Sequence, residues 1–115
     1  MTYFFAMVSV AMAENRVFQA LADPSRRAIF ESLTRGEAAV KDLTARFDIS
    51  QPAVSQHLAA LKAAGLVSGR RDGRQVYYRV ESRGMKPLID WIAHYRAFWT
   101  EHVGRLERLL EKMDE

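Results

Sequence analysis

Apolar residues recur at helical spacing in four short segments of the first half of the chain. In the first segment, residues 14–22, the apolar residues Val17, Phe18 and Leu21 are spaced as on one helix face. A second helix is expected to begin at Asp23 and Pro24, because Asp caps helix N-termini and Pro fits the first turn. It is expected to end near Gly36, and its inward positions are Ile29, Phe30 and Leu33. Two consecutive short helices are therefore predicted.

Two more helices, joined by a tight turn, follow. The first runs from about Val40 to Phe47, with Leu43 and Phe47 inward. Asp48 occupies the turn, where helix-turn-helix motifs often carry Gly, and Asp tolerates the left-handed backbone region. Ser50 is a good N-cap, and Pro52 falls in the first turn, where its missing N–H costs nothing. The resulting helix, Gln51 to Ala64, ends at Gly65 and faces the core through Val54, Leu58 and Leu61.

The pattern then becomes strand-like. Strands are predicted over 66–71 and 75–80. Asp72 and Gly73 stand between them and form a strong hairpin signal, because both tolerate positive φ. A two-stranded β-ribbon is therefore expected after the fourth helix.

The last segment, residues 82–115, is predicted to be one long helix with a coiled-coil-like seam. Two rows of residues repeat every seven positions, namely Leu88, Tyr95, His102 and Leu109, and Ile92, Trp99, Leu106 and Met113. Trp91 and Phe98 widen this seam. A helix this apolar is not stable alone in water, so we expect the seam to pack on the domain, on a second copy, or on both.

Length and composition agree with one small globular domain. The chain has 115 residues, 49% of them hydrophobic, a formal net charge of +3 and no cysteine. The missing cysteine excludes disulfides, thiol nucleophiles and thiolate metal sites. The mild positive charge is compatible with nucleic acid but does not establish it. We divide the chain into an extension (1–13), a core (14–81) and a dimerisation helix (82–115).

The extension, residues 1–13, is apolar and carries no basic residue. It is too short to span a bilayer and lacks the positive segment that begins a signal peptide. We expect either that translation starts at Met12 or that this extension is a short helix packed on a partner. No membrane association is expected, and the predicted location is cytoplasmic.

Two helices joined by a tight turn and followed by a β-ribbon form the order of a winged helix-turn-helix. The second helix of such a pair enters the DNA major groove, and a basic ribbon tip suits phosphates or the minor groove. The tip carries Arg70, Arg71, Arg74 and Arg79, with Asp72 as the only acid that the local sequence places against them. The predicted DNA contacts are Ser50, Gln51, Pro52, Ala53, Ser55, Gln56, His57, Lys62, Arg70, Arg71, Arg74 and Gln75.

Three runs of sequence resemble the ArsR/SmtB family of winged-helix repressors. They are VFQALADPSRR at 17–27, ISQPAVSQHL with LKAAGLV at 49–58 and 61–67, and RRDGRQVYY at 70–78. The resemblance covers about residues 14–80 and implies a homodimeric repressor of an operator with imperfect two-fold symmetry. It implies a mainly α fold with a small β-hairpin and a dimer interface on the terminal helices. The interface residues would be Val17, Phe18, Leu21, Leu88, Ile92, Tyr95, Trp99, His102, Leu106 and Leu109.

The metal sites of the family do not carry over to this sequence. Where some members have Cys-x-Cys, this chain has Ala39 and Lys41, which cannot hold a soft metal. Other members use an Asp-x-His pair on the last helix, but here Ile92 stands two residues after Asp90. The weak zinc candidates are therefore Asp90, His94 and His102. We expect a member of the metal-free branch with no cofactor, and the sequence identifies no effector.

Two alternatives remain beside the DNA-binding repressor. One is a repressor that senses zinc through the terminal helices, and the other is a protein-interaction module that kept the winged-helix fold. An enzyme is not expected. Ser55 and His57 lie two apart on a helix and face different directions, and the sequence has no Gly-rich nucleotide-binding loop.

Overall fold

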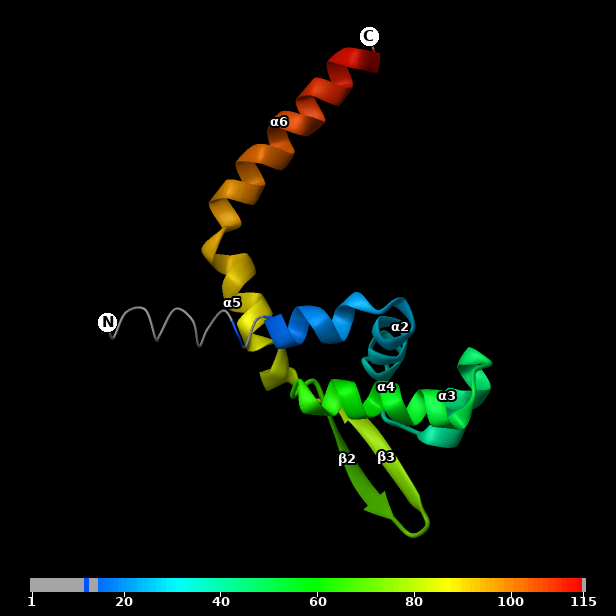
Figure 1. The fold of residues 1–115 in the computed structure, drawn as a ribbon. Coiled ribbons are helices and arrows are strands. Elements are labelled where there is room, and N and C mark those ends of the chain that lie inside the picture. The colour runs from blue at the N-terminus through cyan, green and yellow to red at the C-terminus, as the bar shows by residue number, and fades with distance from the viewer. Residues whose placement is uncertain (1–11, 13–14, 115) are drawn as a thin grey trace, which may run out of the picture.

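The computed structural model describes residue 12 and residues 15–114 (Figure 1). Of the predicted extension 1–13, only Met12 belongs to these residues. Residues 15–22 are helical, and the elements after them are α2 (Pro24–Leu33), β1 (Ala38–Ala39), α3 (Val40–Phe47), α4 (Gln51–Ala63), β2 (Val67–Asp72), β3 (Gln75–Val80), a 3₁₀ turn η1 (Ser82–Met85), α5 (Lys86–His94) and α6 (Arg96–Asp114). The predicted winged helix-turn-helix order is confirmed.

The helix boundaries follow from local signals in the sequence. The Asp23 carboxylate accepts a hydrogen bond from the Arg26 backbone N–H at 2.9 Å and caps α2. The Ser50 hydroxyl accepts one from the Ala53 N–H at 3.2 Å and caps α4. Asp48 ends α3 in the left-handed region, at φ 51° and ψ 42°. Asp23 therefore sets the start of α2, and Asp48 and Ser50 together set the tight turn between α3 and α4.

One core joins the helices and the base of the sheet. α4 packs against both α2 and α3, and β1 and β3 contact α3. The core contains Val17, Ala20, Ile29, Phe30, Leu33, Ala38, Leu43, Val54, Leu58, Leu61, Leu66 and Val67. Of the apolar positions picked out by the helical pattern, Phe18 is an exception at 40% exposed, and Leu21 is half-buried against this core. Phe47 packs against the same cluster while half-buried.

The sheet has three strands in the order β1-β3-β2, so the prediction of a two-stranded ribbon was incomplete. Ala38 pairs with Tyr78 in an antiparallel register. The hairpin prediction was also one residue off. Because Asp72 pairs with Gln75, the two-residue loop is Gly73 and Arg74, and Gly73 has φ 64°. A turn with Gly at its first central position requires positive φ there and leaves Asp72 in the strand.

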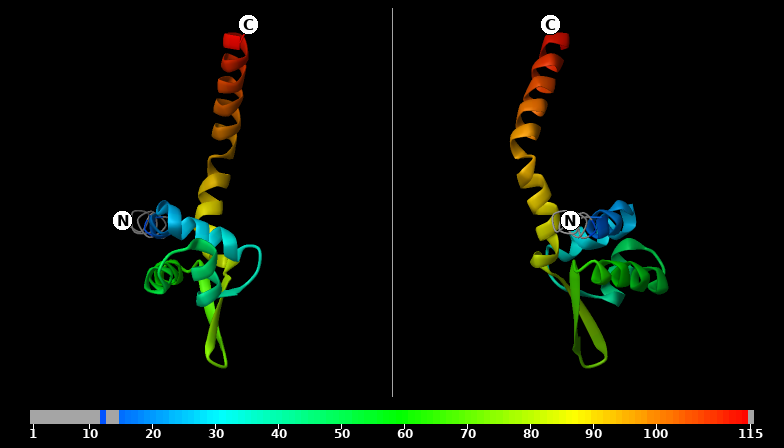
Figure 2. Two further views of the ribbon diagram at one scale, coloured as in Figure 1. Left: turned by 90° about the vertical axis from the view of Figure 1, so that its right-hand side faces the viewer. Right: turned by 60° about the vertical axis from the view of Figure 1, so that its left-hand side comes forward.

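The predicted single helix over 82–115 is divided into η1, α5 and α6. The break falls at Tyr95, whose backbone (φ −102°, ψ 14°) lies outside the helical region. Figures 1 and 2 show α6 running away from the winged domain. Within the described part of the chain, no helix combines the length and apolar character needed to cross a membrane.

Candidate nucleic-acid interface

Helix α4 has a fully buried side and an exposed polar side. Val54, Leu58 and Leu61 are each 0% exposed and fix the helix on the domain. Near its N-terminal end four predicted DNA-contacting residues are exposed, namely Gln51, Pro52, Ser55 and Gln56. Ser50 and Lys62, at the two ends of the helix, are exposed as well. The arrangement matches a recognition helix, whose buried side sets its position and whose outer side stays free.

Two other predicted contacts on α4 are less accessible. Ala53 and His57 are half-buried, and the His57 Nδ1 atom is enclosed with no hydrogen-bond partner among the described residues. His57 also lies near the N-cap of α2. The Arg26 backbone N–H, and to a smaller extent the His57 charge, lower the pKa of the Asp23 carboxyl. His57 therefore lies against the start of α2, and its half-buried side chain is less available for a phosphate than the sequence predicted.

The N-terminus of α4 offers an anion few backbone donors. Pro52 has no N–H, and the Ala53 N–H is taken by the Ser50 hydroxyl. The Val54 N–H donates to the Ser50 carbonyl at 3.1 Å. Gln51 is thus the one first-turn residue whose N–H lacks a partner among the residues described. The exposed side chains, more than the helix end, make this surface suitable for DNA.

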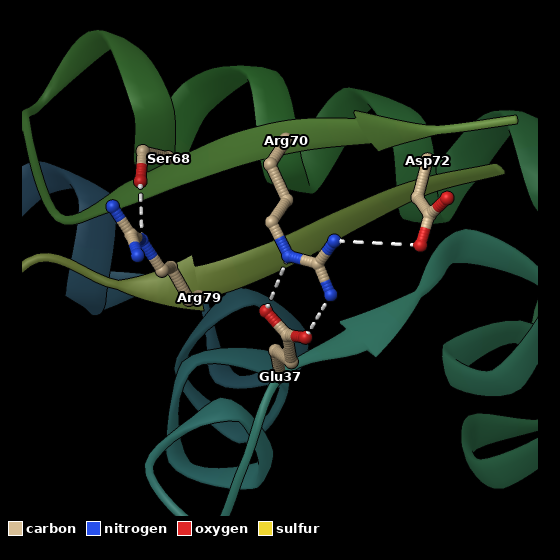
Figure 3. Close-up of polar contacts among 5 residues, drawn as sticks. All are labelled: Glu37, Ser68, Arg70, Asp72 and Arg79. Carbon is tan, nitrogen blue, oxygen red and sulfur yellow. Dashed lines mark hydrogen bonds and ion pairs between the residues drawn. The ribbon is translucent and has the colours of Figure 1, made fainter.

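The wing, residues 67–80, has two classes of arginine. The Arg70 guanidinium donates two hydrogen bonds to the Glu37 carboxylate, one of them from Nε to Oε2 at 3.1 Å (Figure 3). Arg79 donates to Ser68 Oγ at 3.4 Å and lies 3.5 Å from a Glu81 oxygen. The local sequence suggested that Asp72 is the only acid beside these arginines, and this prediction was wrong. Glu37 and Glu81 reach them from outside the hairpin tip.

The second class of wing arginine is free. Arg71 and Arg74 are exposed, and neither has an ion-pair partner among the described residues. Gln75, another predicted contact, is half-buried. The cations available for phosphate at the tip are therefore Arg71 and Arg74. Sequence reasoning missed Glu37 because it is 33 residues from Arg70 and no local pattern joins them. It also missed Glu81, although Glu81 follows Arg79 by two residues, the spacing that places two side chains on one side of an extended chain.

Most residues of the predicted dimer surface are exposed, but Val17 is not. Val17 is only 2% exposed and belongs to the subunit core, so it has almost no surface left for a partner. Leu21 and Leu88 are half-buried against that core, and the Trp99 side chain lies outside the described atoms. The remaining predicted residues are exposed: Phe18, Ile92, Tyr95, His102, Leu106 and Leu109. Phe18 meets Trp91 edge-on at 5.7 Å, which links helix 15–22 to α5.

The weak zinc candidates are not brought together. Asp90 forms an ion pair with Lys86 at 2.7 Å. His102 Nδ1 lies 2.9 Å from the Phe98 carbonyl, and its ring stacks on Phe98. Among the described residues, no group of three or more His, Asp or Glu side chains could hold a metal ion. The geometry therefore gives the metal-sensing alternative no support.

Comparison with known proteins identifies the family. The family model "Bacterial regulatory protein, arsR family" matches residues 23–68. The transcriptional repressor SdpR of Bacillus subtilis is 36% identical over 81 residues, which are 70% of this chain and 90% of that protein. The HTH-type transcriptional regulator Rv2034 of Mycobacterium tuberculosis is 38% identical over 104 residues, which are 90% of this chain and 94% of that protein.

Solved structures agree with the sequence relatives. The crystal structure of the ArsR family transcriptional regulator RHA00566 superposes with a TM-score of 0.70 and 32% identity. The match covers 78% of this chain and 93% of that one. The chain therefore belongs to the ArsR family of bacterial DNA-binding transcriptional regulators, which are not enzymes.

Proposed function

We propose that this chain is a cytoplasmic, dimeric repressor that binds an inverted-repeat operator without a metal cofactor. The observation that carries the proposal is the division of α4 into a fully buried anchoring side and an exposed polar side. In this arrangement α4 enters the major groove and the wing tip reaches the neighbouring backbone. The relatives named as repressors support repression as the outcome of binding.

Base recognition is assigned to the N-terminal half of α4. A glutamine amide can bond both N6 and N7 of adenine, and a serine hydroxyl serves several bases. Gln51, Ser55 and Gln56 provide these groups on the exposed side. Pro52 and the half-buried Ala53 provide apolar surface for a thymine methyl group. These five residues are the proposed reading set.

Backbone binding is assigned to the free cations. Arg71, Arg74 and Lys62 are exposed, and no acidic partner holds them in the described chain. Each phosphate that such a cation neutralises releases counterions and makes the negative slope of log K against log salt steeper by about 0.9. Arg70 and Arg79 are left out of this set because carboxylates already hold them.

Dimerisation is assigned to helix 15–22, α5 and α6. Their exposed large apolar side chains include Phe18, Ile89, Ile92, Tyr95, Phe98, Val103, Leu106, Leu109, Leu110 and Met113. Apolar surface of this extent on a small protein marks an interface. A two-fold dimer would place two α4 helices about 34–36 Å apart, which is one turn of DNA. An operator of two inverted half-sites is therefore expected.

The experiment that tests the reading set compares Gln56→Ala with Arg74→Ala. DNA sites are first selected from a random pool with the wild-type protein, and variant affinities are then measured by fluorescence anisotropy. Gln56→Ala should lose about 1–3 kcal/mol of discrimination between the selected site and single-base variants. Arg74→Ala should weaken all sequences alike and reduce the salt slope by about one.

Matched controls are available elsewhere in the chain. Gln19→Ala on helix 15–22 and Arg108→Ala on α6 repeat the two substitutions at exposed polar positions outside the proposed DNA contacts and outside the apolar set assigned to dimerisation, and both should leave DNA binding unchanged. Unchanged discrimination in Gln56→Ala would remove Gln56 from the reading set. Failure of the wild-type protein to select any DNA would favour the protein-interaction alternative.

A further inference from the structure

The arginines and acids of the wing are sorted by face. Because side chains alternate along a strand, Ser68, Arg70 and Asp72 of β2 share one face of the sheet with their partners on β3. We call this the outer face, and its residues on β3 are Gln75, Tyr77 and Arg79. Two arginines on this face meet three carboxylates, from Glu37, Asp72 and Glu81. The outer face therefore has no surplus positive charge for a phosphate.

Arg70 contacts three other side chains, those of Glu37, Asp72 and Tyr77. Both Glu37 carboxylate oxygens accept hydrogen bonds from its guanidinium (Figure 3). An Asp72 oxygen lies 3.6 Å from Nη1, and the guanidinium carbon sits 5.0 Å from the centre of the Tyr77 ring. Because the planar guanidinium makes several contacts in one orientation, the side-chain entropy lost by fixing Arg70 is shared among them.

The Glu37–Arg70 pair joins two parts of the fold that must cooperate on DNA. Glu37 directly precedes β1, and β1 leads without a break into α3 of the helix-turn-helix. Arg70 lies on β2, which is hydrogen-bonded to β3 and not to β1. The side-chain pair therefore crosses β3 and ties the outermost strand of the wing to the chain entering α3.

We propose that Glu37 and Arg70 are positioning residues that hold the wing at the angle from which Arg71 and Arg74 reach DNA. The inference rests on the proposed function of the wing as a DNA contact. It reassigns Arg70, which the sequence placed among the DNA contacts. A two-stranded hairpin is marginally stable alone. Val67 at the base of this wing is buried in the core, and Tyr78 and Val80 pack against the core while half-buried, but residues 70–76 at the tip contribute nothing to that cluster.

The ionic state of the pair agrees with this role. The hydrogen bond from Arg70 lowers the pKa of the Glu37 carboxyl below its ordinary value of 4.5. The pair is therefore fully ionised at neutral pH. Although an isolated exposed pair adds little stability, this one is bidentate and joined to Tyr77 and Asp72.

The test uses three variants of the full chain: Glu37→Gln, Arg70→Gln and the exchanged pair Glu37→Arg with Arg70→Glu. Affinity for a selected DNA site is measured at several salt concentrations. Each single variant should bind about two- to fivefold more weakly, the range that the coupling of an exposed pair permits. The salt slope should match that of the wild type, because no phosphate contact is lost. The exchanged pair should recover most of the affinity.

Two results would overturn the proposal. If Arg70→Gln reduced the salt slope by about 0.9, Arg70 would itself bind a phosphate. If Glu37→Gln tightened binding, Glu37 would compete with DNA for Arg70 and would not position the wing. Arg71→Ala is the matched control and should reduce the slope.

Hydrogen exchange of the β2 and β3 amides separates this proposal from the proposed function. Faster exchange in both single variants, reversed in the exchanged pair, should occur even if the chain bound no DNA at all. Unchanged exchange in the single variants would show that the pair does not hold the wing.

Discussion

Gly84 is the position at which one added methyl group has the largest predicted effect. It lies in η1, where the chain passes from the wing into α5. A Cβ at this position would overlap the Gly65 carbonyl oxygen and lie 2.5 Å from its carbon and 3.0 Å from Leu66 Cα. All three atoms are backbone, so no side chain can rotate away. The Gly84→Ala variant must therefore separate η1 from the junction of α4 and β2.

The magnitude follows from two opposing effects. Overpacking typically costs about 1–3 kcal/mol. The cost here is expected at the upper end of that range, because the added Cβ would meet backbone atoms, which cannot move aside as a side chain can. Replacing Gly by Ala restores about 0.4–1 kcal/mol by restricting the unfolded chain. The expected loss is therefore about 2–2.6 kcal/mol. For a domain of this size, that corresponds to a fall of about 10 °C in the melting midpoint.

The assay is thermal unfolding followed by circular dichroism at one fixed protein concentration, because the midpoint of a dimer depends on concentration. Gly104→Ala is the matched control. Gly104 lies within α6, and a Cβ there would meet nothing within 4 Å. This control should become more stable by about 0.5–1 kcal/mol, because Ala favours the helix. Equal behaviour of the two variants would refute the close approach of η1 to the Gly65 backbone.

Three further outcomes are expected. Ser50→Ala removes the cap of α4 and should cost about 1 kcal/mol in urea unfolding, whereas Ser50→Asp should retain most of the stability; equal losses in both would show that the cap is unimportant. The pKa of Asp23 is lowered in the folded state, so its stabilisation is complete above the ordinary value of 3.8 and is lost as pH falls through the lower folded pKa; in acid melts, Asp23→Asn should show a weaker pH dependence than the wild type. Stoichiometric zinc should leave operator affinity unchanged in the wild type and in His102→Ala, and release of DNA by zinc would restore the metal-sensing alternative.

Local signals made the helix-turn-helix predictable. Ser50 and Asp23 cap helices through neighbours three residues away, and such contacts are visible in sequence spacing. The buried positions Val54, Leu58 and Leu61 were predictable for the same reason, because one helical period places them on one side.

Long-range pairings were not predictable in this way. β1 has only two residues, Ala38 and Ala39, which are too few to show alternation, and it exists because β3 lies beside it. The Glu37–Arg70 pair likewise depends on how the sheet brings distant segments together. The sequence around Tyr95 contains no Pro or Gly, the usual signals of a helix break. The continuous seven-residue repeat therefore suggested one helix.

A hydroxyl-radical footprint of the purified chain on a DNA site selected from a random pool tests the proposed repressor most directly. Two protected half-sites of inverted sequence are predicted on one side of the duplex, with centres about 10–10.5 base pairs apart. A single protected patch, or protection without sequence preference, would contradict a paired subunit that reads bases through α4.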